Sequence, residues 1–344
     1  MSNKLPNGLS YDDVLLVPRY SDIESRSEID LSADMGKTLQ LDLPLFSSPM
    51  DTISEDRMAI AMDKAGGAAI IHRYNSIKQQ EELVSKSVSE SRNNVGAAIG
   101  ITGDYLERAT AAFNAGATFI CVDVAHGHHS MMQKALNRLK KLLGENYHIM
   151  AGNVATLQGV NDLADWGADS VRCNIGGGSI CSTRIQTGHG VPGLQTIIDC
   201  AQTDRDVKII ADGGIRNSGD IVKAIAAGAD AVMCGSLFAG TTESPGDIIM
   251  DNSGFRWKTY RGMASKEAQI DWKGKYSSFE GVSARVPFRG PMEEILFNLE
   301  KGIRSGYSYS GARNATELQA VAEFMHQTSA GQSESNTHIN QRAW

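Results

Sequence analysis

The sequence predicts an α/β protein folded as a single closed (β/α)8 barrel (a TIM barrel), and three observations support this prediction. Short, nearly all-apolar strand candidates alternate with segments of helix length, which is typical of a parallel sheet covered on both faces. A phrase of Ala-Gly-Ala or a close variant followed by an apolar strand recurs at 114–123, 166–174 and 227–235. Polar and glycine-rich residues follow many of these strands, as at the catalytic face of a barrel.

Taken in order along the chain, the first barrel strand is predicted at 45–48, after an N-terminal arm formed by residues 1–45. Two more apolar strands, at 148–153 and 208–214, end in loops that carry polar residues and glycines. A doubly wound open sheet is the alternative architecture. It is disfavoured because no G-x-G-x-x-G follows the first strand.

Two segments interrupt the repeating pattern. Residues 251–290 contain aromatic and basic residues, several glycines and few strand patterns, which predicts an active-site flap between late barrel units. The polar segment 329–344 is predicted to be a flexible tail. Residues 1–344 are therefore expected to form one catalytic domain.

Composition narrows the classes of function. The 344 residues carry a formal net charge of −7, so we expect no nucleic-acid partner. No apolar run approaches the roughly 18 residues of a membrane span, and the N-terminus has no signal-peptide core. The five cysteines are an odd number without a C-x-x-C pair, which argues against a zinc site or a disulfide framework. We expect a cytoplasmic enzyme in a reducing compartment.

The run 174–184, Asn-Ile-Gly-Gly-Gly-Ser-Ile-Cys-Ser-Thr-Arg, is the most informative motif. Glycines let the backbone turn tightly and approach a ligand closely, and their exposed peptide groups can hold an ion. Cys181 follows the last glycine by three residues, on a turn that suits a nucleophile. The alternative for the isolated motif is a helix-capping turn with an incidental cysteine.

Three further strand ends are candidate ligand sites. Asp212, followed by two glycines, can accept hydrogen bonds from a ribose diol; the alternative is an aspartate that caps a helix. Residues 235–240 form a glycine-rich entry to a helix, as at the late-strand phosphate sites of barrels, or else provide packing glycines. The segment 123–129 contains three histidines, but their spacing fits no zinc site. We expect a loop that contacts a cofactor there.

Together these segments resemble the inosine-monophosphate dehydrogenase / guanosine-monophosphate reductase family. The resemblance runs in order over roughly residues 8–310 and rests on nine pieces: 11–18, 47–52, 151–154, 176–183, 211–216, 235–240, 243–246, 260–263 and 280–281. Any one piece is weak support, whereas the ordered set is specific. The family implies a (β/α)8 barrel, usually a homotetramer, and a covalent thioimidate between the loop cysteine and purine C2.

The resemblance also implies a role for each matching residue. Cys181 is the nucleophile, and Thr183 and Glu280 complete the catalytic set. The residues that hold a purine mononucleotide are Ser179, Gly214, Gly235, Ser236 and Tyr260 at the 5′-phosphate, Asp212 at the ribose, and Ser48, Met50, Gly262 and Met263 at the purine. The residues on the cofactor side are Asp123, Ala125 and Asn153. The carbonyls offered to a monovalent cation such as K⁺ are those of Gly176, Gly178 and Cys181. The family usually has proline where Gly177 stands, and glycine is expected to make this loop more flexible.

Both family reactions use the covalent intermediate. The dehydrogenase (IMP, NAD and water to XMP) then needs a flap that brings in an arginine–tyrosine base. The reductase (GMP and NADPH to IMP and ammonia) needs an acid for the leaving amine. The flap segment 264–279 is short and contains no arginine, and its Lys275-Tyr276 pair lies close to Glu280. This pattern, and the absence of an inserted CBS domain, favour a reductase in which Thr183 and Glu280 move the proton.

Residues 281–290 and 331–335 resemble dehydrogenases, so they favour the other reaction of the family. Two further alternatives are disfavoured. A non-catalytic nucleotide-binding barrel would not need Cys181, Thr183 or Glu280, and flavin binding in an FMN-dependent barrel would not explain the cysteine. The choice between NADPH and NAD is open, because His72-Arg73 and Lys78 could meet a 2′-phosphate or be ordinary surface charges.

Overall fold

The computed structural model describes residues 6–37, 39–91, 94–276 and 280–337. Eight parallel strands close into a barrel, which confirms the predicted fold. In barrel order they are β4 (Leu45–Ser47), β5 (Ala68–Ile71), β6 (Val95–Ile99), β7 (Phe119–Asp123), β8 (His148–Val154), β9 (Ser170–Cys173), β10 (Lys208–Asp212) and β11 (Ala231–Cys234). The barrel closes where β11 pairs with β4, with Val232 opposite Leu45.

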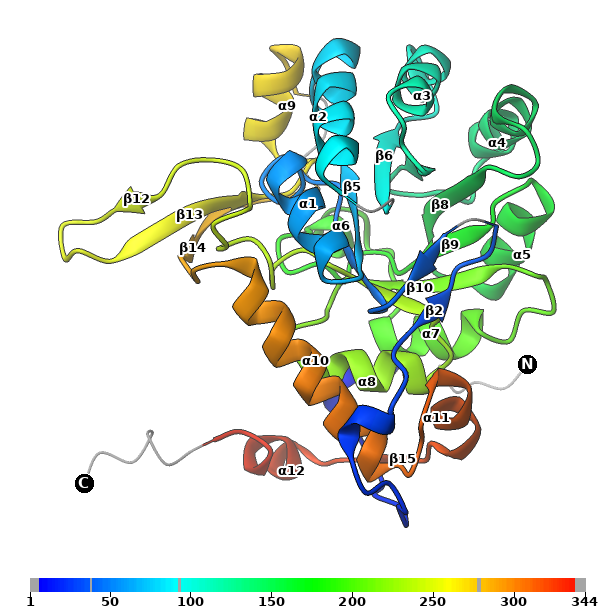
Figure 1. The fold of residues 1–344 in the computed structure, drawn as a ribbon, viewed down its shortest axis with the longest axis vertical. Helices are drawn as coiled ribbons and strands as arrows, with labels where there is room; N and C mark the ends of the chain where they lie inside the picture. The colour runs from blue at the N-terminus through cyan, green and yellow to red at the C-terminus, as the bar shows by residue number, and fades with distance from the viewer. Residues whose placement is uncertain (1–5, 38, 92–93, 277–279, 338–344) are drawn as a thin grey trace.

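Helices surround this barrel (Figure 1). They are α1 (Asp56–Lys64), α2 (Ile77–Glu90), α3 (Tyr105–Asn114), α4 (Ser130–Leu143), α5 (Leu157–Asp165), α7 (Gly193–Cys200), α8 (Ser218–Ala226) and α10 (Met292–Tyr309). Helix α4 illustrates why they form: its buried residues Met132, Ala135, Leu136 and Leu139 recur at helical spacing and make one apolar face. The helix ends at Gly144, whose φ of 85° suits a residue without a Cβ.

The N-terminal arm and the C-terminal segment meet. Strand β1 (Val14–Leu16) follows the short helix η1 (Tyr11–Asp13) and pairs antiparallel with β15 (Phe324–His326). A second short helix, η2 (Arg26–Glu28), leads to the hairpin of β2 (Ala33–Asp34) and β3 (Gln40–Leu41). The described part of the arm, from residue 6 onward, therefore contains regular structure and pairs with the C-terminal segment.

The C-terminal segment contains α11 (Ala315–Val321) before β15 and α12 (Ser329–Glu334) after it. The predicted tail thus begins with a helix whose first turn is capped by the side chain of Thr328. Residues 338–344 lie outside the described residues. No helix within the described ranges is both long enough and apolar enough to cross a membrane.

The predicted flap region contains more strand than its sequence indicated. Strands β12 (Ile249–Met250), β13 (Arg256–Arg261) and β14 (Ser283–Pro287) form an antiparallel sheet, and α9 (Lys266–Lys273) lies between the last two. In Figure 1 this sheet, yellow to orange, extends away from the barrel, while α9 stands beside α2. Residues 277–279 of the region lie outside the described part of the chain.

A buried histidine begins β8. His148 is fully buried, its Nε2 lies 2.8 Å from the Ser170 hydroxyl, and its ring is T-shaped to the Phe119 ring, with centroids 6.1 Å apart. Burial lowers the pKa of His148 to about 4, because desolvation disfavours the charged imidazolium.

This histidine predicts a loss of stability in acid. The pKa of His148 is about 6.5 in the unfolded chain. Between that pH and about pH 4 the imidazole is protonated in the unfolded chain and neutral in the folded one, so the free energy of unfolding falls as pH drops through this range. The expected cost at pH 5 is roughly 2 kcal/mol. Urea unfolding at pH 7 and pH 5 checks this. In His148→Gln the difference between the two pH values should shrink by that amount, and an unchanged difference would contradict the prediction.

Candidate active site

A cavity of about 330 Å³ lies at the carboxyl ends of the barrel strands, within the size range of small-molecule sites. Every site residue predicted from the sequence lines it: Ser48, Met50, Asp123, Ala125, Asn153, Gly176, Gly178, Ser179, Cys181, Thr183, Asp212, Gly214, Gly235, Ser236, Tyr260, Gly262, Met263 and Glu280. The fold therefore brings together residues that are more than 230 positions apart in the sequence (Ser48 and Glu280).

The cysteine loop follows β9 and is held by the flap. The Cys181 N–H donates to the Gly178 carbonyl at 3.1 Å, which closes a turn. The backbone of Cys181 also forms an isolated antiparallel β-bridge with that of Gly281. On either side of it, the Ser182 N–H donates to the Glu280 carbonyl and the Val282 N–H donates to the Ile180 carbonyl, each at 3.0 Å. The segment that carries Glu280 is thereby held beside the nucleophile.

A line of hydrogen bonds leads away from the thiol. Cys181 Sγ donates to Thr183 Oγ1 at 3.1 Å, and Thr183 Oγ1 donates to Glu280 Oε2 at 2.9 Å. Thr183 is the first residue of the short helix α6 (Thr183–Thr187), which fixes it two positions after the nucleophile. The arrangement can pass a proton between the sulfur and the carboxylate through one hydroxyl.

Arg172 organises the carboxylates of the pocket, and sequence reasoning missed it. Its Nη2 donates to Asp212 Oδ2 at 2.8 Å and its Nη1 donates to Asp123 Oδ1 at 2.5 Å. The amide of Asn153 donates to the same Asp212 oxygen at 2.7 Å. Burial acts to lower the pKa of Arg172, but Asp212, Cys121 and Asp123 outweigh it and raise that pKa well above its usual range. The available signal was a charged residue inside an otherwise uncharged buried strand, Ser-Val-Arg-Cys.

The proposed phosphate end of the pocket is built from glycines. Gly213 and Gly214 adopt φ values of +90° and +79°, which L-residues with side chains rarely adopt. A Cβ on Gly235 would lie 3.0 Å from the Tyr260 hydroxyl and 3.5 Å from Ser48 Oγ, so glycine keeps this corner open. Ser179 Oγ lies 3.5 Å from the Tyr260 hydroxyl.

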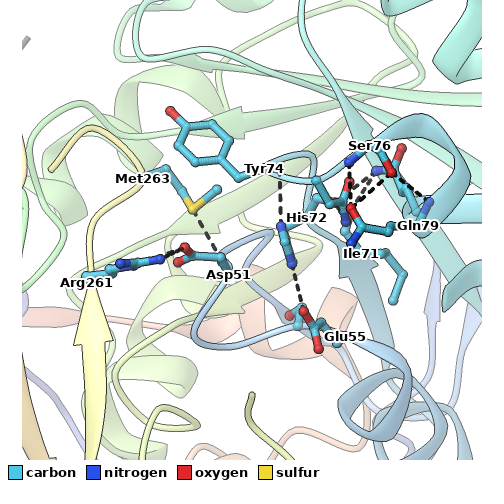
Figure 2. A network of polar contacts seen from close by, with 12 residues as sticks. Asp51, Glu55, Ile71, His72, Tyr74, Ser76, Gln79, Arg261 and Met263 are labelled. Atoms are coloured by element: carbon cyan, nitrogen blue, oxygen red, sulfur yellow. Dashed lines mark hydrogen bonds and ion pairs between the residues drawn. The ribbon is translucent and has the colours of Figure 1, made fainter. Parts of the chain in front are cut away.

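The flap is attached to the barrel by contacts that the sequence did not reveal. Arg261, at the end of β13, donates to Asp51 at 2.6 Å and to Asp271 of α9 at 2.5 Å. The ring of Trp272, also in α9, stacks on Tyr74 with centroids 4.1 Å apart. Figure 2 shows Asp51 between Arg261 and Met263, whose sulfur accepts from the Asp51 N–H at 3.3 Å.

His72 supports the loop that presents Tyr74 to the flap. The Tyr74 N–H donates to His72 Nδ1 at 3.2 Å, so the proton of a neutral imidazole sits on Nε2, which lies 3.1 Å from Glu55 Oε1 (Figure 2).

The Lys275-Tyr276 pair of the flap lies apart from the site residues, because neither residue lines the cavity. The Tyr276 ring lies under the ammonium of Lys266, at 5.0 Å.

The three-histidine segment after β7 has separate contacts. His128 Nε2 lies 2.7 Å from Asp162 Oδ2, and His129 Nδ1 accepts from the Met131 N–H at the start of α4. Within the described ranges no three or more His, Cys, Asp or Glu side chains gather in a way that could hold a metal.

The three predicted cation ligands have other neighbours in the structure. The Gly178 carbonyl accepts the Cys181 N–H at 3.1 Å, which leaves its second lone pair for a cation. The stem of Arg184 lies beside Gly176, because a Cβ there would lie 2.5 Å from Arg184 Cγ. The K⁺ site stays a prediction, and we assign it no catalytic step.

Gly177 leaves room for a neighbouring amide. A Cβ on Gly177 would lie 2.0 Å from the Asn174 side-chain nitrogen, so Asn174 occupies the space that a larger residue would need. Overpacking of this kind costs about 1–3 kcal/mol. We expect Gly177→Pro to lower kcat/KM for the purine mononucleotide substrate by about tenfold or more. The double variant Asn174→Gly/Gly177→Pro should recover most of that loss in a steady-state assay. A double variant as weak as the single one would show that the clash is not the cause.

Comparisons with known proteins agree on one family. Residues 8–338 match the IMP dehydrogenase / GMP reductase domain. Inosine-5′-monophosphate dehydrogenase of Nitrosopumilus maritimus is 34% identical over 96% of this chain and 98% of its own length. GMP reductase of Leishmania major is 31% identical over 97% of each. A cysteine-to-alanine variant of GMP reductase from Trypanosoma brucei, solved with guanosine 5′-monophosphate, superposes with a TM-score of 0.92 at 30% identity, covering 98% of this chain and 99% of the other.

The alignments also test one sequence argument. They extend over 468 and 479 positions for the first two relatives, more than the 344 residues of this chain. Relatives with either activity in their name therefore contain segments without a counterpart here. The absence of an inserted domain does not separate reductase from dehydrogenase.

Proposed function

Because this chain belongs to the IMP dehydrogenase / GMP reductase family, we propose that it is a GMP reductase, which converts GMP to IMP and ammonia with NADPH. One observation carries the choice of reaction. The pocket contains the Thr183–Glu280 pair beside Cys181, whereas Lys275 and Tyr276, the flap's candidates for a hydrolytic base, are not among its lining residues. The site is thus equipped to move a proton at the substrate.

The chemistry follows from these contacts. Thiolate attack by Cys181 on purine C2 forms a carbon–sulfur bond, and the thiol proton passes through Thr183 toward Glu280. The same pair returns a proton to the C2 amino group, which leaves as ammonia when its carbon–nitrogen bond breaks. A reduced nicotinamide supplies the hydride that replaces sulfur at C2. Cys181 then departs as the thiolate, and one further proton balances the reaction.

The same pocket provides binding groups for both ligands. The free oxygen of Asp212 suits the ribose diol of the mononucleotide, and the glycine corner around Gly214 and Gly235 suits its phosphate. On the cofactor side, Ala125 is exposed and the Asp123 side chain is partly exposed, which fits a nicotinamide riboside. Arg73 also lines the pocket, with its Nε 3.8 Å from Asp123 Oδ2. It therefore lies at the nicotinamide riboside, whereas the extra phosphate of NADPH is on the adenosine ribose, so we assign Arg73 no contact with that phosphate. We also propose a homotetramer, which light scattering of the purified protein would test.

Absorbance at 340 nm distinguishes the two family reactions. The purified protein is given GMP with NADPH in one mixture and IMP with NAD⁺ and K⁺ in another. A fall in the first, with ammonia released in equal amount, supports the reductase. A rise only in the second would make the protein a dehydrogenase and would overturn the proposal. Repeating the first mixture with NADH tests the choice of dinucleotide.

A further inference from the structure

A row of ion-paired side chains lies in the lining of the pocket. Asp212 at the end of β10 pairs with Arg172 of β9, and Arg172 pairs with Asp123 at the end of β7. The Arg172 side chain is 7% exposed, and the side chains of Asp123 and Asp212 are 18% and 12% exposed. Arg73 extends this row of ion pairs, because its Nε lies 3.8 Å from Asp123 Oδ2. Its guanidinium lies 5.7 Å from the ring of Trp272 in the flap.

The guanidinium engages one oxygen of each carboxylate. Arg172 donates through Nε and Nη2 to Asp212 Oδ2, at 3.1 and 2.8 Å, and through Nη1 to Asp123 Oδ1 at 2.5 Å. Asn153 also donates to Asp212 Oδ2, so three donors converge on that atom. The second oxygen of Asp212 has no bond to Arg172 and is the one that can accept from a ligand. One planar fork therefore sets the orientation of two carboxylates on different strands.

We propose that Arg172 is a positioning residue that couples the mononucleotide subsite at Asp212 to the dinucleotide subsite at Asp123. This inference rests on the proposed function, which assigns a ribose to each carboxylate. A ribose diol on Asp212 fixes that carboxylate, which fixes the guanidinium, which in turn fixes Asp123 before the second ligand arrives. The first ligand to bind therefore pays the conformational entropy of ordering the Asp212, Arg172 and Asp123 side chains. The second ligand meets side chains that are already ordered, so each ligand binds more tightly when the other is present.

Lysine at this position separates charge from geometry. Its single ammonium retains the positive charge that the buried carboxylates need, but it lacks the rigid fork that bonds both at once. Arg172→Lys should therefore fold while losing the link between Asp123 and Asp212. Arg205 provides a matched control, since it also bridges two carboxylates, Asp165 and Asp204, on the protein surface away from the pocket. Arg205→Lys is the same substitution in the same kind of bridge.

Calorimetric titration measures the coupling without turnover. GMP is titrated into the protein alone and into the protein saturated with NADP⁺, which cannot reduce it, and the ratio of the two dissociation constants is the coupling factor. We expect a factor of about 5–20 in favour of joint binding for the unaltered protein and for Arg205→Lys. For Arg172→Lys we expect a factor near 1, with each ligand alone bound within about fivefold of its original affinity.

The outcomes separate the two proposals. If the unaltered protein binds neither GMP nor NADP⁺, the proposed function fails, and this inference fails with it. If both ligands bind and the coupling factor is unchanged in Arg172→Lys, the function survives and the coupling role is overturned. Thermal unfolding of each variant is measured alongside. Should Arg172→Lys not fold, the double variant Asp123→Asn/Arg172→Lys removes one buried carboxylate and repeats the test, with Asp123→Asn alone as its reference.

Discussion

Replacing Cys181 with alanine is expected to lower GMP reduction by at least about a thousandfold, because no other group in the pocket can form the covalent bond to purine C2 in its place. The loop geometry does not depend on the thiol. The bridge to Gly281 and the turn to Gly178 are made by backbone groups that alanine keeps. The variant should therefore bind GMP with a dissociation constant within a few-fold of the unaltered protein.

The measurement is NADPH oxidation at 340 nm together with calorimetric GMP binding. Cys200→Ala is the matched control, since Cys200 is a buried cysteine of α7 that does not line the pocket. It should retain nearly full turnover. A Cys181→Ala protein that still oxidises NADPH at more than a few per cent of the original rate would exclude a covalent mechanism.

The barrel could be predicted from the sequence because its strands have a strong local signature. Strands such as β7 and β10 are short runs of apolar residues, buried along almost their whole length and ended by polar residues. The repeated Ala-Gly-Ala phrase marks where β7, β9 and β11 begin. The flap sheet was missed for the opposite reason. Strand β14 is almost entirely exposed, so its Ser-Ala-Arg-Val-Pro sequence has no apolar periodicity to detect.

The site residues could be predicted only where a backbone requirement or a family motif marks them. The glycines around Gly214 and Gly235 are visible in the sequence because a positive φ or a close approach excludes other residues. Arg172 and Trp272 act through partners on other strands and loops, Asp123, Asp212 and Tyr74. Such contacts depend on tertiary packing, and no local pattern in a single sequence specifies them.

Breaking the hydrogen-bonded line from Cys181 should separate proton transfer from substrate binding. Thr183→Val removes the hydroxyl that links the sulfur to the carboxylate while keeping the shape of the side chain. Glu280→Gln keeps the size of the acceptor but removes its charge. We expect each variant to lower kcat by about a hundredfold, the usual range for a positioned acid or base, with KM for GMP changed by less than about fivefold.

The double variant decides whether the two residues act as one unit. If the proton must pass through Thr183 to reach Glu280, replacing either residue already stops the transfer. Thr183→Val/Glu280→Gln should therefore be about as slow as either single variant. Rates are compared by NADPH oxidation and ammonia release. Glu267→Gln, an exposed flap carboxylate in the first turn of α9, should be unaffected. Losses that multiply in the double variant would mean that the two residues act independently. In that case one of them reaches the leaving amine directly, and the relay through Thr183 would be wrong.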